Sequence, residues 1–227
     1  IATSMTSQVR GMNQGIRNAN DGISMAQTAE GALSEVTNML QRQRELTVQA
    51  SNDTYSADDL ANLKSEMDAL NTQISSVLTN TEFNGQKLFN ASAGNAGVVT
   101  IQAGANAADA VTIDLSTALS GHADLTATAG VDVTALAGGE IALFDDAIKT
   151  VSTTRANLGA SQNQLESAVV NLGNNITNLS DARSRIEDTD YSAETTALAK
   201  SQILSQASSA MLAQANQSQQ NVLSLLR

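Results

Sequence analysis

Two long heptad tracts, one near each end of the chain, constrain the fold more than any other feature of this sequence. The first tract steps by four and three through Met5, Val9, Met12, Ile16, Ala19, Ile23 and Ala26, and resumes at Leu33, Val36 and Leu40. The second places an apolar residue every seven positions, at Val151, Leu158, Leu165, Leu172, Leu179 and Ile186. Sustained 3.5-residue spacing is typical of long helices that bury a narrow stripe against one another. The tracts therefore predict packed helices and not a globule around a pocket.

Composition supports this interpretation and excludes several classes of function. The 227 residues include no proline, which suits uninterrupted helices because proline removes a backbone hydrogen bond and kinks the axis. The net charge of −11 disfavours nucleic-acid binding, which needs a basic surface. The sequence shows no apolar stretch near the ~20 residues that cross a bilayer, so membrane insertion is not expected. The absence of cysteine excludes disulfides and thiolate chemistry.

The order of elements follows from caps, turns and changes of period. A first helix is predicted from Ile1 to about Ala50, in which glycines permit the close approach of a neighbouring element. Ser56 and Asp59 have the spacing of a capping box that begins a second helix, and this helix should fold back on the first. Its apolar stripe is Leu60, Leu63, Met67, Leu70, Ile74 and Val77.

The middle of the chain changes period. Asn84-Gly85 indicates a turn, and alternating residues around Ile101 and Ile113 predict two short strands. Residues 116–139 are poorly patterned and are expected to form a surface-exposed insertion or a very small lobe. Helix is predicted again from about Ile141 to Ile186, with an interruption at 187–190. A final amphipathic helix has an apolar stripe without an evident partner in the chain, at Leu198, Ile203, Ala207, Met211, Ala215, Val222 and Leu226.

Five blocks of residues resemble bacterial flagellins and occur in that family's order. They are Arg17–Ile23 with Gln27–Ala32, Leu40–Gln49, Thr81–Leu88, Arg155–Ala160 with Gln162–Asn163, and Ala210–Asn216 with Val222–Arg227. The resemblance covers about 1–115 and 141–227. It implies a mainly α fold with a small β region, a long antiparallel helical rod or coiled-coil bundle that carries a short β-hairpin segment.

The resemblance also implies a domain organisation. It assigns 1–115 and 141–186 to a helical rod core domain with a β-hairpin region at about 84–115. It assigns 116–140 to a short variable insertion and 187–227 to the C-terminal inner-tube helix. The family's N-terminal inner-tube helix has no counterpart here, so we expect an N-terminally truncated chain whose final helix lacks its usual partner.

A flagellin-like chain is expected to be a structural subunit that self-assembles into the bacterial flagellar filament for motility. It would be secreted and would act outside the cell. Its implied partners are other flagellin subunits, an export chaperone, the filament cap and hook-junction proteins. No enzyme activity, catalytic residue or cofactor is expected.

Two candidate surfaces come from the resemblance. Arg42, Leu46 and Glu66 match positions recognised by toll-like receptor five of vertebrate hosts, flanked by Gln41, Gln49 and Leu63. Helical spacing supports one face for 42, 46 and 49, with a guanidinium fork and Leu46 as an apolar anchor. Packing between neighbouring subunits is the competing and primary interpretation. The second surface is the tail, where a secretion chaperone and cytosolic inflammasome receptors bind related proteins, or where simple inner-tube packing occurs: Val222, Leu223, Leu225, Leu226 and Arg227.

Other polar clusters do not predict a metal site. Asp188, Asp190 and Ser192 lack the glycine and glutamate of a calcium loop, and we expect them to cap a helix. His122 is the only histidine, has no partner at ligand spacing and is expected in a solvent-exposed loop. Two alternative functions remain at this point. One is a hook–filament junction protein, and the other is a flagellin-like surface protein that binds glycans through residues 116–140, although that segment has no aromatic platform.

Overall fold

The computed structural model describes residues 1–106 and 108–225, without the side chains of 188–190 and 219–225. The helices are α1 (Ala2–Ala50), α2 (Ala57–Asn80), the 3₁₀ helix η1 (Leu119–Gly121), α3 (Ala123–Ala129) and α4 (Glu140–Leu225). The strands are β1 (Glu82–Phe83), β2 (Gln86–Lys87), β3 (Val98–Gln102) and β4 (Ala110–Asp114). The predicted mainly α fold with a small β region is confirmed. Contacts divide the chain into one unit of residues 10–175 and a second of 1–9 with 176–227.

Helix α1 confirms the heptad prediction and corrects which residues are buried. A buried stripe steps alternately by three and four residues through Met12, Gly15, Ala19, Gly22, Ala26, Ala29, Leu33, Val36, Leu40, Gln43, Thr47 and Ala50. Ile16 and Ile23 lie beside this stripe and are only half-buried. Glycines therefore take positions that the sequence pattern assigned to isoleucines.

Helix α2 begins and packs as predicted. The Ser56 hydroxyl accepts a hydrogen bond from the Asp59 backbone N–H at 3.3 Å, and Asp59 Oδ2 accepts one from the Ser56 N–H at 3.2 Å. This reciprocal pair satisfies two backbone donors at the helix start. Gln43 on α1 donates to Asn71 Oδ1 on α2 at 2.6 Å, which ties the two antiparallel helices together. Met67, Ile74 and Leu78 form the buried side of α2.

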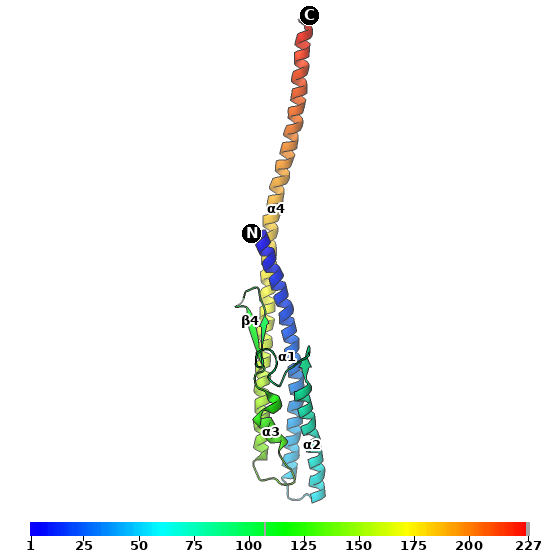
Figure 1. The fold of residues 1–227 in the computed structure, drawn as a ribbon, viewed down its shortest axis with the longest axis vertical. Coiled ribbons are helices and arrows are strands. Elements are labelled where there is room, and N and C mark those ends of the chain that lie inside the picture. The colour runs from blue at the N-terminus through cyan, green and yellow to red at the C-terminus, as the bar shows by residue number, and fades with distance from the viewer. Residues whose placement is uncertain (107, 226–227) are drawn as a thin grey trace. The chain divides into compact units, whose positions relative to one another are not determined.

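The structure has two β-hairpins, where the sequence predicts one hairpin and a separate turn at Asn84-Gly85. Strands β1 and β2 pair around Asn84-Gly85, and β3 pairs antiparallel with β4 so that Thr100 faces Thr112. The β3–β4 hairpin contacts both long helices of its unit. Asn18 of α1 donates to the Gln102 carbonyl at 3.1 Å, and Ser161 of α4 donates to the Thr112 carbonyl at 3.3 Å. Figure 1 shows this hairpin beside α4.

Residues 116–139 form a small lobe, which is the second of the two expected arrangements, and not a surface-exposed insertion. Leu119, Leu125, Val131 and Val133 are at most 7% exposed and belong to the main hydrophobic core. The expectation that His122 lies in a solvent-exposed loop is also wrong. His122 is the N-cap of α3, where its Nδ1 accepts a hydrogen bond from the Asp124 N–H at 3.3 Å. The lobe is compact because apolar residues with no clear period still meet one continuous core.

Helix α4 continues through the predicted interruption at 187–190. The backbone there is helical, and the Ser192 carbonyl accepts side-chain hydrogen bonds from Thr195 and Thr196. Residues 188, 190 and 192 are therefore inside a helix and do not cap one. The acidic residues and threonine at 187–190 have only modestly low helix propensity. No glycine or proline lies at 187–190 to end the helix there. Among the residues described, no helix is long and apolar enough to cross a membrane.

Candidate interaction surfaces

The first candidate surface is organised by Arg42 on the outer side of α1. Its Nε donates to Glu66 Oε1 of α2 at 2.8 Å, and a second guanidinium nitrogen donates to Glu45 at 3.3 Å. The hydrogen bonds that Arg42 donates, first to Glu66 and then to Glu45, raise the pKa of Arg42 above its ordinary value. About half of the Arg42 side chain stays exposed, at 49%. Because water screens these exposed ion pairs, they add little to the stability of the fold. They do hold the charges of Arg42, Glu45 and Glu66 in a fixed arrangement on the surface.

Leu46 does not belong to this exposed surface. Its exposure is 0%, although Arg42 and Gln49 on the same helix are exposed. The expectation of an exposed apolar anchor at Leu46 is therefore wrong for this fold. The reason is that α1 is covered from two sides near its end. Gln43 bonds to Asn71 of α2, and Arg44 pairs with Asp145 of α4 at 2.7 Å.

The remaining residues of the first surface are peripheral to Arg42. Gln41 is exposed, Leu63 is half-buried, and Gln49 donates to the Tyr55 hydroxyl at 3.1 Å. Sequence reasoning missed Glu45 and Tyr55 as partners. The three-residue spacing from Arg42 to Glu45 is a signal that finds the first, but Tyr55 becomes a neighbour only through the turn after α1. The structure thus brings Arg42 and Glu66 together and removes Leu46 from their surface.

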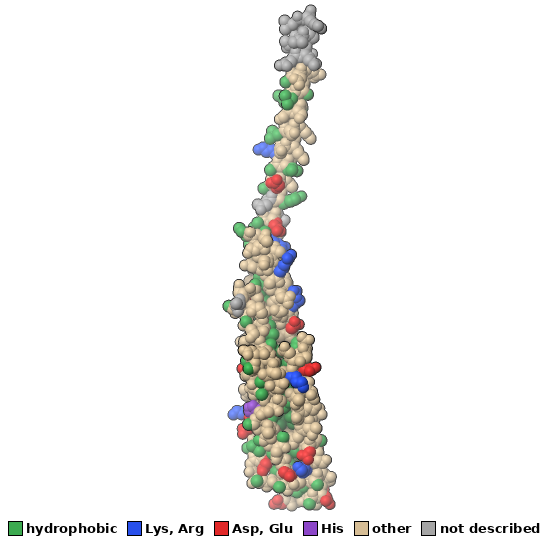
Figure 2. Space-filling view, in the orientation of Figure 1, with side chains coloured by type: hydrophobic (Ala, Val, Ile, Leu, Met, Phe, Trp, Pro, Cys, Tyr) green, Lys and Arg blue, Asp and Glu red, His purple; other side chains and the backbone are tan. Residues whose placement is uncertain are grey.

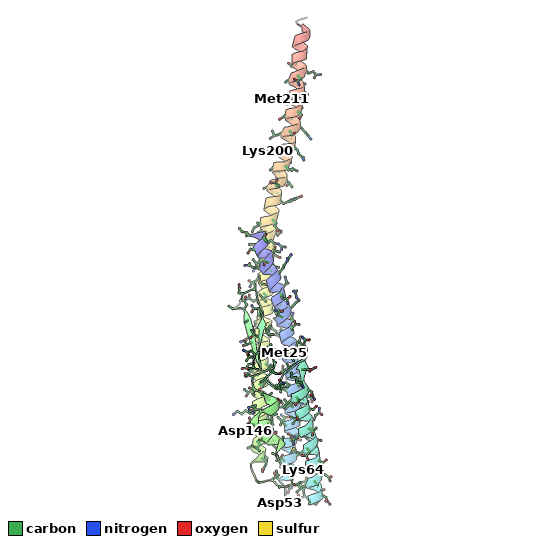
Figure 3. All side chains as sticks on the ribbon, viewed as in Figure 1. Met25, Asp53, Lys64, Asp146, Lys200 and Met211 are labelled. Carbon is green, nitrogen blue, oxygen red and sulfur yellow. The ribbon has the colours of Figure 1, made fainter. Side chains whose placement is uncertain are left out.

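A further surface, which includes part of the predicted apolar stripe without a partner, is the stretch of α4 from 191 to 218. Every residue in this stretch is exposed. Six large apolar side chains in it are between 56% and 73% exposed, namely Tyr191, Leu198, Ile203, Leu204, Met211 and Leu212. Figure 2 shows hydrophobic side chains along this part of the helix, and Figure 3 shows Met211 projecting from it. Sequence reasoning missed Tyr191 because it lies beside the expected interruption at 187–190. It missed Leu204 and Leu212 because they lie outside the single stripe that the spacing picked out.

The predicted tail surface, residues 222–227, lies mostly outside the described part of the structure. The side chains of Val222, Leu223 and Leu225 lie outside the described residues, and so do Leu226 and Arg227 as a whole. The roles expected for them stay predictions.

A polar hollow lies between the α3 lobe and α4. Its walls include His122, Asp124, Asp146, Lys149 and Thr150. The Thr150 hydroxyl donates to Asp124 Oδ2 at 2.6 Å, so this carboxylate is already engaged within the protein. Within the described ranges, no three His, Cys, Asp or Glu side chains are placed to hold a metal ion.

Comparisons with known proteins agree with the arrangement of helices and hairpins. Residues 1–94 match the bacterial flagellin N-terminal helical region, and residues 141–226 match the bacterial flagellin C-terminal helical region. A flagellin of Halalkalibacterium halodurans is 44% identical over 229 residues, covering 100% of this chain and 83% of that protein. A flagellin of Bacillus subtilis is 40% identical over 257 residues, covering 100% of this chain and 84% of that protein. The crystal structure of Bacillus cereus flagellin has a TM-score of 0.60 at 28% identity, covering 69% of this chain and 88% of that chain. The chain therefore belongs to the bacterial flagellin family.

Proposed function

We propose that residues 191–218 of α4 are a surface through which copies of this protein associate. As a flagellin, the protein is a structural subunit of the bacterial flagellar filament. The observation that carries the proposal is the set of six exposed large apolar side chains on this one helix. Exposed apolar side chains are unfavourable in water and mark a surface that another element covers. Tyr191 and Leu198 lie far around the helix axis from Leu204 and Met211, so this surface includes more than one side of the helix.

The composition of the stretch suits association between helices. Glu194 and Lys200 are its only charged residues, and most other positions are Ala, Ser or Gln. Small side chains let neighbouring helices approach closely. Fully burying a large apolar side chain stabilises by about 1.5–3 kcal/mol, so covering the exposed part of these six would contribute roughly 6–12 kcal/mol before the cost of association.

Further partners are proposed from the same surfaces. The exposed stretch and the tail after it would be covered by an export chaperone before assembly. The filament cap and the hook-junction proteins would meet the same helix during assembly, and export would place the protein outside the cell. Recognition by toll-like receptor five of a host would use Arg42 and Glu66, with Gln41 and Gln49 at the edge, and would not involve Leu46 directly. Identity over the whole chain to two proteins named flagellin favours this function over that of a junction protein.

Seeded elongation tests the proposal. Sheared native filaments would be mixed with the purified full chain, and their growth would be measured by electron microscopy. A double variant, Leu204→Asp with Met211→Asp, places two charges on the apolar face. The matched control is Gln206→Asp with Ala213→Asp, which has the same charge and spacing and lies about half a turn around the helix from Leu204 and Met211. We expect growth by the parent and the control and none by the apolar-face variant.

Because all four positions are exposed, urea unfolding of the parent and the variants should be closely similar. Equal growth by the apolar-face variant and the parent would contradict the proposal. Failure of the parent itself would count against assembly through this chain.

A further inference from the structure

The tip of the β1–β2 hairpin combines three features that favour one chemical reaction. Asn84 and Gly85 are the only Asn-Gly pair in the sequence, and they form the whole loop between the paired residues Phe83 and Gln86. Both loop residues are exposed and have positive φ, at 50° and 77°. A methyl group placed on the Gly85 Cα would meet no atom within 4 Å. Gly85 has no side chain, and the space beside its Cα is open, so little bulk lies next to the reacting residue.

We propose that Asn84 is a site of spontaneous deamidation in the folded protein. The Gly85 backbone nitrogen loses its proton to hydroxide and attacks the Asn84 side-chain carbonyl carbon Cγ. The new N–Cγ bond closes a five-membered succinimide, while the Cγ–Nδ2 bond breaks and ammonia leaves. Water then opens the ring at either carbonyl, which yields aspartate or isoaspartate at this position. Water is the only other reactant, and no oxidation or reduction takes place.

The hairpin is closed beside its loop by the pair Phe83–Gln86, but it has only two residue pairs, which lets the loop reach the geometry for attack. Each strand is two residues long, and short two-stranded hairpins open easily. The bonds that hold it lie below the loop. Lys87 Nζ donates to the Thr79 carbonyl at 2.7 Å, and the Leu88 N–H donates to the Thr81 carbonyl at 3.1 Å.

The two products would affect the hairpin differently. Aspartate tolerates the left-handed backbone that this loop requires, so the turn keeps its form. Isoaspartate adds one carbon to the main chain, and a two-residue loop with that extra atom no longer matches the pairing of Phe83 with Gln86. Phe83 packs against the hydrophobic core, and Leu88 and Phe89 directly after the hairpin are fully buried. Isoaspartate formation would therefore loosen an attachment of the hairpin to the core.

Mass spectrometry of the full chain tests the assignment. The protein would be incubated at 37 °C in native buffer at mildly alkaline pH, and the gain of about 1 Da per event would be followed with time. Tryptic cleavage after Lys64 and Lys87 isolates residues 65–87, in which fragment ions separate Asn84 from Asn71 and Asn80. We expect the early gain to lie at Asn84 and to become faster as pH rises, because the attacking nitrogen must lose a proton.

Two variants sharpen the test. Asn84→Asp removes the reacting amide, keeps the turn and should abolish the early mass gain. Asn52→Asp is the matched control, since Asn52 is exposed in a turn but is followed by Asp53, and it should leave the gain unchanged. A first gain at any other asparagine, or an undiminished gain in the Asn84→Asp variant, would overturn the proposal. So would a gain at Asn84 that occurs in urea but not in native buffer.

Discussion

Alanine placed at three glycines of α1 should give opposite changes in stability, although the chemical change is the same. The three positions, Gly15, Gly22 and Gly31, lie in the unit formed by residues 10–175. Glycine in the interior of a helix costs roughly 0.5–1 kcal/mol relative to alanine, because the unfolded chain loses more conformational freedom. A change to alanine should gain this amount wherever the new methyl group has room.

The structure gives each position a different amount of room. At Gly31, an added Cβ meets no atom within 4 Å, so Gly31→Ala should stabilise by about 0.5–1 kcal/mol. At Gly15, the Cβ would lie 2.9 Å from the Ala103 carbonyl carbon and 2.9 Å from the Gly104 nitrogen, both backbone atoms that follow β3. Overpacking costs about 1–3 kcal/mol, so Gly15→Ala should destabilise by a net amount of roughly 0.5–2 kcal/mol.

Gly22 is the intermediate case. Its added Cβ would lie 2.9 Å from Ile101 Cγ1 and 3.1 Å from Leu165 Cδ1. Side-chain atoms move more easily than backbone, so Gly22→Ala should fall between the other two variants.

Urea unfolding followed by circular dichroism at 222 nm measures these differences. Stability is compared through the transition midpoint, provided that the slope with urea is the same for all variants. The expected order of stability is Gly31→Ala, parent, Gly22→Ala and Gly15→Ala. If Gly15→Ala were as stable as Gly31→Ala, the close approach of the β3–β4 hairpin to α1 would be refuted.

Two further predictions concern α1 and α2. Leu46→Ala should cost about 2–5 kcal/mol in urea unfolding because it leaves a cavity, whereas Val48→Ala, two residues away and 48% exposed, should change stability by about 0.5 kcal/mol or less. The pKa of Asp59 is lowered by hydrogen bonds, first from the Ser56 hydroxyl and then from the Ser56 N–H. The pKa of Asp59 in the folded protein is below its value of about 3.9 in the unfolded chain. The contribution of Asp59 to the free energy of unfolding is therefore complete above pH ~3.9 and is lost as pH falls through the folded pKa. Asp59→Asn should therefore make the acid loss of stability shallower in denaturation curves measured from neutral pH downward, and a slope identical to that of the parent would contradict this. Ser56→Ala should cost about 1 kcal/mol at neutral pH, and no loss in thermal unfolding would exclude a role for the cap.

Local chemistry made several elements predictable. A capping box needs only a serine and an acidic residue three positions later, so the start of α2 follows from Ser56 and Asp59. The turn at Asn84-Gly85 depends on two neighbouring residues that accept positive φ. Alternating residues located β3 and β4 for the same reason, since the period of a strand is visible within five residues.

The candidate surfaces were less predictable because exposure depends on what else packs nearby. Spacing placed Arg42, Leu46 and Gln49 on one side of α1, and that is geometrically correct. Whether a residue on that side meets water depends on α2 and α4, which approach the end of α1 from two directions. The prediction of a helix interruption at 187–190 was wrong for a related reason. Weak helix formers end a helix only when no neighbouring turn continues the hydrogen-bond ladder.

The sequence by itself determined the first two long helices and their apolar stripes, the β3–β4 hairpin, the turn at Asn84-Gly85 and the family, since each depends on residues close together in the chain or on ordered blocks. The pairing of β1 with β2 and the continuity of α4 through 187–190 came from the structure. Only the tertiary structure decided that Gly15 and Gly22 are buried in place of Ile16 and Ile23, and that Leu46 lies in the core. It also placed Leu119, Leu125, Val131 and Val133 in that core, although their segment has no clear period. The physical reason is that a period shows which residues share a face, whereas burial is set by elements that are distant in sequence and close in space.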